Sequence, residues 1–516
     1  MRSRSPGDLP VPSTLAALLA GPAADEPAIG APGRPALSHG ELRNLVSRTT
    51  SALRTLGIRR GDRVAIVLPN GPEMAACFLC VAAACAAAPL NPGYREEEFR
   101  FALADLGARL LLVMKGVDSP ACAAARSVGI DIVELVPDAA GPAGRFTLDG
   151  AAHCGEPPAI DADPAPGDIA LLLHTSGTTA RPKLVPLTQG NLCASAVAVR
   201  DALALAPADR ALGIMPLFHV HGLVAGLLAP LAAGSSVFCS PGFDALKFFA
   251  WMGEWRPTWY TAVPTMHQAI LARAGRNPEV LRRNPLRFLR SSSSAIPPTV
   301  ATQLETAFGA PLIEAYGMTE AAHKMASNPP PPAGRKPGSV GRPAGADIAL
   351  MDAAGALLPR GATGEIVIRG PGVTTGYLDN PAANATAFIG GWFRTGDQGF
   401  MDDDGYLFVT GRLKEIINRG GEKISPREVD EVIMDHPAVA QVVCFAVPHP
   451  KLGEEVGAAV VLKEGASASE KDIQTFVATR LADFKVPKKV LILPEIPKGA
   501  TGKLQRIGLA QKLGLA

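Results

Sequence analysis

The sequence carries almost no net charge and has no block of basic residues. Its 50 Lys and Arg against 48 Asp and Glu leave a formal charge of +2. We therefore expect no nucleic-acid partner and no membrane partner held by bulk electrostatics. A convincing membrane span is also missing, because the longest apolar run, the Ala- and Cys-rich stretch after Glu73, is more typical of a buried core helix.

Cysteine is sparse and scattered, with 8 residues in 516. Cys77, Cys80 and Cys85 stand close together, but no second pair of ligands follows and the surroundings are apolar. The pattern favours buried helix thiols over a zinc site and suits a reducing compartment, so we expect a cytoplasmic protein. The N-terminal apolar core, Leu15–Ala20, is too short for a signal peptide and predicts a first helix capped by Ser13.

The length predicts at least two folded units, because single cores usually stop growing near ~250–300 residues. From Asp62 onward, β-branched runs such as RLLLVM, GIDIVEL, DIALLLH and SSVFCS alternate with helical segments. This alternation predicts an α/β fold with doubly wound, mostly parallel sheets. In such folds, ligands bind beyond the carboxyl ends of the strands, which is where the segment from His174 to Lys183 falls.

After about Gly361, hairpin patterns replace this alternation. GEIVIRG and GYLFVTGR are strand-like and are accompanied by turn sequences such as GGWF and DDDG. They predict a β-rich portion made of antiparallel hairpins. The three carboxylates Asp402–Asp404 are more typical of a turn than of a metal cluster.

A further change after Gly411 predicts a second, smaller domain of the α+β type. Its first helix is expected at SPREVDEVIMDHP, with Ser425 as the N-cap and Pro426 in the first turn. Strands and one more helix are expected to follow. We therefore divide the chain into a large N-terminal domain, residues 1–411, and a small C-terminal domain, residues 412–516.

The segment TSGTTARPK, Thr175–Lys183, follows the apolar run Ala170–Leu173. It is not a Walker A loop, because no Gly precedes Lys183. Its small residues would nevertheless let backbone N–H groups approach an anion, while its hydroxyls and its lysine supply donors and charge. Taken alone, the segment is as compatible with an ordinary Ser/Thr-rich surface loop as with a phosphate loop.

Four further motifs accompany this segment. They are EAYGMTE at Glu314–Glu320, WFRTGDQG around Asp397, GRLKEIINRGGEKISPREVD from Gly411 and PKGATGKLQR around Lys503. Together and in this order they resemble the motifs of the adenylate-forming superfamily, which comprises acyl-CoA synthetases, adenylation domains and luciferases. The resemblance covers nearly the whole chain and implies the fold of these enzymes, in which the small C-terminal domain is mobile.

The resemblance implies an ATP site. The segment TSGTTARPK would close over the β- and γ-phosphates, and Tyr316 and Gly317 would contact the adenine. Asp397 and Arg412 would contact the ribose, and Thr319 would lie near the α-phosphate. In full, the implied ATP-binding residues are Thr175, Ser176, Gly177, Thr178, Thr179, Lys183, Tyr316, Gly317, Met318, Thr319, Asp397, Arg412 and Lys503. The implied catalytic residues are Thr319, Glu320 and Lys503.

The chemistry of this family explains why such residues are needed. A carboxylate attacks the α-phosphate, so one anion approaches another, and Lys503 with a Mg²⁺ ion held by Glu320 would offset the repulsion. Coenzyme A would then attack the acyl-adenylate through its thiol. Lys503 must leave for this second step, so the resemblance places a hinge at Lys414 and a thiol tunnel along Gly420 and Gly421.

Two residues depart from the family's pattern in the phosphate segment. The family usually has Gly where this chain has Ala180 and Leu184. Each side chain adds a β-carbon and restricts the backbone. We expect slower or altered closure over ATP, not its loss.

The predicted acid pocket is unusually polar for this family. MPLFHVHGL, which contains His219, walls the acyl pocket in the family, and LRSSSSAIPP places Ser292, Ser293 and Ser294 at its floor. His323 follows the EAYGMTE motif. A long acyl chain would prefer an apolar tunnel, whereas a small, doubly charged acid would prefer donors and cations. These motifs resemble oxalate–CoA ligases, which implies that oxalate, ATP and CoA give oxalyl-CoA, AMP and diphosphate.

Other interpretations stay open. His219 and His323 could be packing residues in a ligase for a medium-chain or aromatic acid such as 4-coumarate. In a different class, the protein could load a carrier protein or bind nucleotide without catalysis, although no carrier segment is visible in the sequence and Glu320 and Lys503 are both present. The sequence does not distinguish a monomer from a homodimer.

Overall fold

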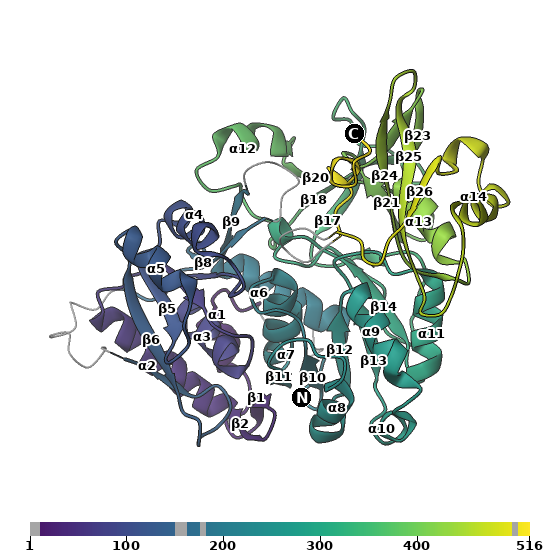
Figure 1. Ribbon diagram of the computed structural model, residues 1–516. Coiled ribbons are helices and arrows are strands. Elements are labelled where there is room, and N and C mark those ends of the chain that lie inside the picture. The colour runs from purple at the N-terminus through teal and green to yellow at the C-terminus, as the bar shows by residue number, and fades with distance from the viewer. Residues whose placement is uncertain (1–10, 150–161, 176–181, 498–503) are drawn as a thin grey trace, which may run out of the picture.

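Two mostly parallel sheets form the larger part of the molecule (Figure 1). The computed structural model describes residues 11–149, 162–175, 182–497 and 504–516. Within them, the first sheet contains, in spatial order, β7 (Phe146–Leu148), β6 (Asp131–Pro137), β5 (Leu110–Met114), β3 (Arg63–Val67), β4 (Ala86–Pro89), β8 (Ile169–His174) and β9 (Leu184–Thr188). The second contains β16 (Arg342–Pro343), β15 (Ala326–Ser327), β14 (Leu312–Tyr316), β13 (Phe288–Ser291), β12 (Trp259–Ala262), β10 (Arg210–Gly213), β11 (Ser236–Cys239), β1 (Pro27–Ala31) and β2 (Arg34–Ser38).

The pairing confirms the predicted α/β fold. From β6 to β8 every neighbouring pair in the first sheet is parallel, and only the edge strands β7 and β9 pair antiparallel. The second sheet is parallel from β14 to β1 and antiparallel at β2, β15 and β16. The inner strands are short apolar runs because helices cover both of their faces.

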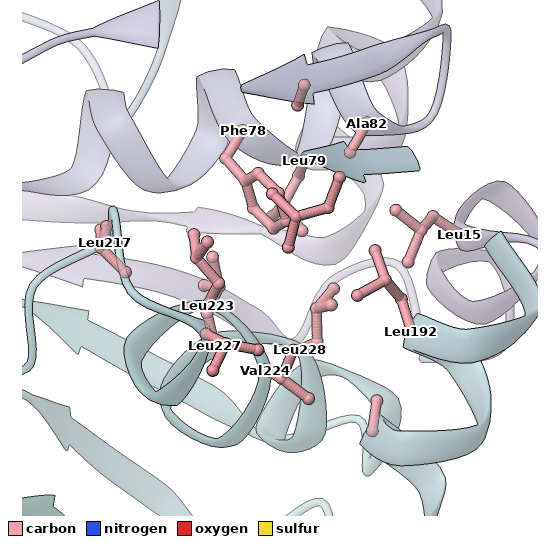
Figure 2. Close-up of a cluster of buried hydrophobic side chains, with 14 of the residues drawn as sticks. Leu15, Phe78, Leu79, Ala82, Leu192, Leu217, Leu223, Val224, Leu227 and Leu228 are labelled. Carbon is pink, nitrogen blue, oxygen red and sulfur yellow. The ribbon is translucent and has the colours of Figure 1, made fainter. Parts of the chain in front are cut away.

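A layer of helices between the two sheets forms the main core (Figures 1 and 2). It contains α1 (Leu15–Ala20), α3 (Pro72–Ala82), α6 (Gln189–Ala202) and the π-helix η1 (His221–Leu228). Figure 2 shows Leu79 of α3, Leu192 of α6 and Leu223 of η1 pointing into one apolar space. Helix α3 is buried on all sides because it contacts β4 of one sheet and β11 of the other. This confirms that the thiols of Cys77, Cys80 and Cys85 are buried.

The cap of the first helix was predicted wrongly. Thr14, not Ser13, is the N-cap of α1, and its side chain accepts a hydrogen bond from the backbone of Ala17. The phase of the helix explains the difference, because Leu15, Leu18 and Leu19 must all face the core. A helix that begins at Leu15 is capped by the residue directly before it.

The remaining helices of this part lie mainly on the outer faces. Helices α4 (Glu96–Leu106) and α5 (Pro120–Ser127) cover the first sheet, and α8 (Phe248–Trp255), α9 (Pro264–Ala274) and α11 (Pro298–Phe308) cover the second. The others are α2 (His39–Thr55), α7 (Ala229–Ala232), α10 (Pro278–Arg283) and the 3₁₀ turn η2 (Thr319–Ala321). In the described part of the chain, none of the helices has the length and apolarity needed to cross a membrane.

A third, antiparallel sheet confirms the predicted hairpins. It contains β17 (Asp347–Met351), β18 (Thr363–Arg369), β20 (Trp392–Met401), β19 (Phe388–Ile389) and β21 (Leu407–Arg412), with α12 (Pro381–Ala387) beside it. Asp402–Asp404 form a turn between β20 and β21, as predicted. Lys336 Nζ bridges Asp402 (2.5 Å) and Asp404 (2.6 Å). Among the described residues, no group of His, Cys, Asp and Glu is arranged to hold a metal ion by itself.

A fourth sheet begins shortly after β21 ends. It contains β23 (Glu422–Ile424), β22 (Ile417–Arg419), β25 (Gly453–Leu462), β24 (Val439–His449) and β26 (Lys489–Ile492). Its helices are α13 (Pro426–Met434), α14 (Glu470–Ala478), η3 (Asp483–Lys485) and α15 (Leu509–Lys512). Ser425 is the N-cap of α13, as predicted. The sheets change between Arg412 and Ile417, and the domain boundary near Lys414 stays a prediction.

Candidate active site

The predicted nucleotide residues come from three different sheets. Thr175 follows β8 in the first, Tyr316 ends β14 in the second, and Asp397 lies in β20 of the third. Thr175 and Tyr316 thus stand at the carboxyl ends of their strands, where ligands of α/β folds bind. Tyr316 and Asp397, which are 81 residues apart in the sequence, meet in a hydrogen bond.

The ends of the phosphate segment are held together. The backbone N–H of Thr175 donates to Lys183 O (2.8 Å), and the Lys183 N–H donates to Thr175 Oγ1 (3.2 Å). Leu184 starts β9 and is buried, so the hydrophobic effect favours an apolar residue at this position. Its expected effect on loop closure stays a prediction. Residues 176–181 lie outside the described residues, so phosphate contacts stay predictions for Ser176, Gly177, Thr178 and Thr179, as does the expected effect of Ala180.

A buried carboxylate, Asp397, links two of the predicted ATP residues. It accepts a hydrogen bond from the hydroxyl of Tyr316 and forms an ion pair with Arg412, whose Nε lies 3.2 Å from Asp397 Oδ1. Asp397 and Arg412 are direct partners across β20 and β21. Burial raises the pKa of Asp397, and the neighbouring Arg412 opposes that rise. The carboxylate is therefore compensated within the protein and has the acceptor oxygens that a ribose needs.

Glu320 lies beside Tyr377, a residue that the sequence motifs did not point to. The hydroxyl of Tyr377 donates to Glu320 Oε1 (2.9 Å), and Lys183 Nζ stands 4.4 Å from the centre of the Tyr377 ring. Burial raises the pKa of Glu320, while Arg412 and Lys183 lower it. A single buried carboxylate next to a lysine suits a Mg²⁺ ion that bridges phosphates and keeps several waters. Thr319, directly before it, starts the turn η2.

Gly317 marks a point where the chain crosses itself. A Cβ atom at this position would lie 1.3 Å from the carbonyl oxygen of His323, which no side chain tolerates. The fold-back is fixed by hydrogen bonds from His323 N to Met318 O (2.9 Å) and from Met325 N to Tyr316 O (3.1 Å). The predicted adenine segment and the predicted acid residue His323 are therefore in direct contact.

A buried arginine, Arg290 at β13, is the centre of a polar cluster around the predicted acid residue His323. Its side chain is fully buried, and it donates from Nη2 to His323 Nε2 (2.9 Å) and from Nη1 to Thr261 Oγ1 (3.1 Å). Among the described residues, its Nε has no hydrogen-bond partner. Burial lowers the pKa of Arg290 to about 9, so the group is still charged at neutral pH. Within the described residues, no carboxylate forms an ion pair with it.

Two histidines face this arginine. The rings of His221 and His323 are stacked, with centres 4.8 Å apart and planes 18° from parallel. His221 Nε2 accepts from Arg290 (3.3 Å), which leaves Nδ1–H to donate to Ser293 Oγ (2.9 Å). His323 likewise accepts from the arginine, and burial followed by the charge of Arg290 lowers the pKa of His323 well below its usual range. The hydrogen bonds therefore assign His323 as a neutral ring.

The predicted serine run divides into two parts. Ser292 is buried, and its hydroxyl donates to Ala315 O (3.0 Å), so it holds β13 to β14. Ser293 has a left-handed backbone with φ of 71° and reaches His221, as described above. Ser294 is exposed. Of the two histidines in FHVHG, His221 joins the cluster, whereas the half-buried ring of His219 packs against Phe218 with centres 4.6 Å apart.

The residues predicted for the second step lie in or beside the fourth sheet. Lys414 is exposed in the segment between the third and fourth sheets. Gly420 and Gly421 form the exposed turn between β22 and β23, with φ of 59° and 100°, and Gly420 N donates to Leu452 O (2.8 Å). Positive φ at both central positions is typical of a tight hairpin turn and requires such residues. Lys503 lies outside the described residues, so its role stays a prediction.

Sequence reasoning missed several central residues of this site. Arg290 stands directly before the serine run, and His221 stands two positions after His219. An arginine inside an apolar strand, FLRS, is the signal that could have identified Arg290, because an arginine is almost never fully buried without a partner. Tyr377 has no comparable signal, because only the fold places it beside Glu320.

Comparison with protein families accounts for most of the chain. The family described as "AMP-binding enzyme" matches residues 20–378, and "AMP-binding enzyme C-terminal domain" matches residues 428–503. The oxalate–CoA ligase of Arabidopsis thaliana is 46% identical over 493 residues, which cover 94% of this chain and 95% of that protein. The oxalate–CoA ligase of Saccharomyces cerevisiae is 41% identical, over 88% of this chain and 87% of that protein.

A solved structure is similar throughout. ATP-bound MatB from Rhodopseudomonas palustris superposes with a TM-score of 0.88 at 30% identity and covers 97% of this chain and 98% of its own. The likeness includes both the large parallel sheets and the C-terminal sheet, because the coverage extends over nearly all of both chains. It confirms the fold that the motifs predicted.

Proposed function

The chain belongs to the family of AMP-binding enzymes, and we propose that it joins oxalate to coenzyme A. It is an AMP-forming acid–thiol ligase, which uses Mg-ATP and CoA and activates its acid as an acyl-adenylate. The proposed overall reaction converts oxalate, ATP and CoA to oxalyl-CoA, AMP and diphosphate. The acid is the part of this statement that needs an argument from the pocket.

The single observation that carries the proposal is the buried, unneutralised charge of Arg290. The guanidinium contacts imidazole nitrogens and a hydroxyl, and its Nε has no partner in the part of the chain that the structure describes. Burying a charge without a counter-ion costs several kcal/mol. A protein keeps such a group where a ligand supplies the missing negative charge. The two oxygens of a carboxylate suit the planar guanidinium.

The reacting carboxylate cannot be that counter-ion. It must face the α-phosphate of ATP, near Thr319 and the Mg²⁺ ion that Glu320 would hold. An acid with one carboxylate would leave Arg290 unneutralised in the complex. An acid with a second carboxylate supplies the negative charge that neutralises Arg290, and oxalate is the smallest acid with two carboxylates. His323 and Ser293, which were predicted from the sequence, would hold the same group through Arg290 and His221.

The space behind the polar cluster also favours a small acid. A cavity lined by Gly213, Met215, Leu217, Gly222 and Thr261 has about 10 Å³ of room, which is no more than one water molecule occupies. An acyl chain or an aromatic ring needs a pocket of roughly 300 Å³ or more. This observation weighs against the medium-chain and 4-coumarate-like alternatives.

In the first step, the bound carboxylate attacks the α-phosphate and diphosphate leaves. Mg²⁺, when bound, offsets the negative charge of the phosphates. Glu320 suits this ion because it is a buried carboxylate whose Oε1 accepts a hydrogen bond from Tyr377. Asp397 and Arg412 would hold the ribose, and Lys503 would stabilise the charge that develops at the α-phosphate.

In the second step, the thiol of CoA attacks the acyl carbonyl and AMP leaves. Lys503 must withdraw and the Gly420–Gly421 turn must approach, so the C-terminal domain must rotate about Lys414. The exposed position of Lys414 and of the turn is compatible with such a rotation. In the orientation seen here, the backbone N–H of Gly420 donates to Leu452 O within the fourth sheet's own loops.

The experiment that tests the proposal is diphosphate release by the purified protein with Mg-ATP and CoA. The acids compared are oxalate, malonate, acetate, octanoate and 4-coumarate. A preference for oxalate supports the proposal, and a preference for malonate keeps the second carboxylate but changes the acid. Turnover of octanoate or 4-coumarate would contradict the role given to Arg290. No turnover of any acid would favour a carrier-loading protein or a nucleotide-binding protein without catalysis.

A further inference from the structure

A second buried base lies beside the acid pocket. Lys324 directly follows His323, is 1% exposed, and has no hydrogen-bond partner for its Nζ among the described residues. Its backbone N–H donates to Ser195 Oγ of α6 (3.3 Å), which fixes the start of the side chain. A side chain that only fills space here would be apolar, because a buried amine without a partner is costly.

The surroundings of Lys324 keep the amine inside the protein. A Cβ atom at Gly345 would lie 3.2 Å from Lys324 Cγ and 2.7 Å from the Cβ of Ala198. The lysine stem therefore runs between α6 and Gly345, and the glycine leaves the room for it. A lysine that snorkels keeps its amine in water, whereas this one does not reach the surface.

The groups that act on Lys324 are basic. Arg290 faces it from β13, and the ring of His323 is its neighbour in the chain. No carboxylate is among the groups that affect it in the described part of the structure. Burial, followed by the charge of Arg290, lowers the pKa of Lys324 well below its usual range. Because the amine is buried and has no hydrogen-bond acceptor among the described residues, the pocket without substrate favours its neutral form.

The charge of the proposed substrate gives this neutral amine a use. A dicarboxylate brings two negative charges into the pocket, and Arg290 supplies one positive charge. We propose that Lys324 takes up a proton from solvent when the acid binds and so supplies the second positive charge. When one carboxylate becomes the acyl group of the mixed anhydride with AMP, that carboxylate loses its negative charge and Lys324 returns its proton to solvent. The inference rests on the proposed function, because it requires a dianionic acid.

Proton uptake has a measurable consequence for oxalate binding. In the pH range where Lys324 is neutral in the free protein and protonated in the oxalate complex, the oxalate KM increases about tenfold for each unit by which the pH is raised. Lys324→Met removes the amine but keeps a side chain of similar length. We expect the oxalate KM of this variant at pH 7 to rise about tenfold or more, with loss of the pH slope. The KM for ATP should change by less than about twofold.

The direct test is calorimetry of oxalate binding to the full-length protein. Mg²⁺ and α,β-methylene ATP are present, so the ternary complex forms without cleavage, and a titration without protein corrects for oxalate that binds Mg²⁺. Titrations in phosphate and in Tris at one pH give the number of protons taken up. We expect about one proton for the wild type and for the surface control Lys115→Met, and close to none for Lys324→Met.

Two outcomes would overturn the inference. One is a wild-type value near zero; the other is proton uptake that persists in Lys324→Met but disappears in His323→Gln, which would assign the proton to His323. A melting curve checks that Lys324→Met is folded, and its Tm should be at or above that of the wild type because an unpartnered buried amine is removed. If the wild type shows no oxalate-dependent diphosphate release, the proposed function fails together with the inference.

Discussion

The nucleotide site and the acid pocket treat buried charge in opposite ways. In the nucleotide site, Asp397 is paired with Arg412 and with the Tyr316 hydroxyl, and Glu320 accepts from Tyr377. In the acid pocket, Arg290 contacts neutral partners and Lys324 Nζ has no partner, and neither has a carboxylate within the described chain. The carboxylates Asp397 and Glu320 and the bases Arg290 and Lys324 are all buried.

The difference teaches which ligand each site can reject. A site whose charges are already balanced binds its ligand by hydrogen bonds and shape, and it stays intact when the ligand leaves. A site with unbalanced positive charge is stabilised only by an anion of matching charge. We therefore expect the acid pocket to discriminate between acids, because a wrong acid leaves its buried positive charge unpaired at a cost in free energy. The nucleotide site has no such unpaired charge, so we expect it to hold both ATP and AMP.

Gly317→Ala should have the largest effect, because this position belongs to both regions. The added Cβ must displace the His323 carbonyl, which moves the adenine segment and the acid pocket together. We expect kcat/KM for ATP and for oxalate each to fall at least about 10³-fold. Gly275→Ala is the control, because its Cβ would meet nothing within 4 Å. An effect on one substrate alone would show that the two regions are not coupled here.

Arg290→Met should break the acid pocket and leave the nucleotide site unchanged. We expect kcat/KM for oxalate to fall about 10²–10³-fold, with the KM for ATP changed less than about threefold. Arg290→Lys keeps the charge but loses the planar fork, so it should restore only part of the activity. Equal losses for ATP and oxalate, or a normal rate with oxalate, would contradict the comparison. Steady-state kinetics of diphosphate release measures both substrates.

Asp397→Ala should give the reverse pattern. The KM for ATP should rise about 10–100-fold, while the KM for oxalate at saturating ATP should change little. The variant leaves the buried Tyr316 hydroxyl without its acceptor, so we also expect a loss of about 1–3 kcal/mol of stability. Thermal unfolding measures this loss, and Asp397→Asn is the matched variant that keeps an acceptor oxygen. A Tm unchanged by both substitutions would argue against a compensated site.

Glu314→Gln should have the smallest effect, visible only as a change in stability with pH. Glu314 accepts from Gly338 N (3.0 Å), and burial raises its pKa to about 7 from an ordinary value of 4.5. The folded protein therefore holds a proton that the unfolded chain releases. This stabilisation is full below pH ~4.5 and is lost as the pH rises through about 7.

The glutamine mimics the protonated side chain at every pH. The variant and the wild type should melt together at pH 4.5, and the variant should melt roughly 1–3 °C higher at pH 8. Oxalate turnover should not change, because Glu314 contacts neither region. If instead the variant melted above the wild type at pH 4.5 and together with it at pH 8, the raised pKa of Glu314 would be contradicted.

Local signals predicted much of the fold. The β-branched runs became β5, β6, β8 and β11, and Ser425 capped α13 as expected. These features depend on neighbours in the chain, so periodicity and capping patterns report them. The cap of α1 was off by one residue because Thr14 and Ser13 are chemically alike and core packing chose between them.

The candidate site was predicted unevenly. Tyr316, Glu320, Asp397 and Arg412 were named from motifs, and the structure brings all four into one region. Arg290 was overlooked although its neighbours were quoted, since a single arginine gives no sign of its burial. Lys324 is the same case: a lysine is normally solvated, and nothing local indicates that Gly345 and α6 enclose it.

The sequence by itself determined the order of elements, the motifs of an AMP-binding enzyme and the polar character of the acid pocket. These are properties of short segments, because interactions between residues close in the sequence determine them. Only the tertiary structure decided that Arg290, His221 and His323 meet without a carboxylate, and that Gly317 ties them to the nucleotide segment. Whether a buried charge is balanced depends on residues from distant strands, so the assembled fold alone reveals it.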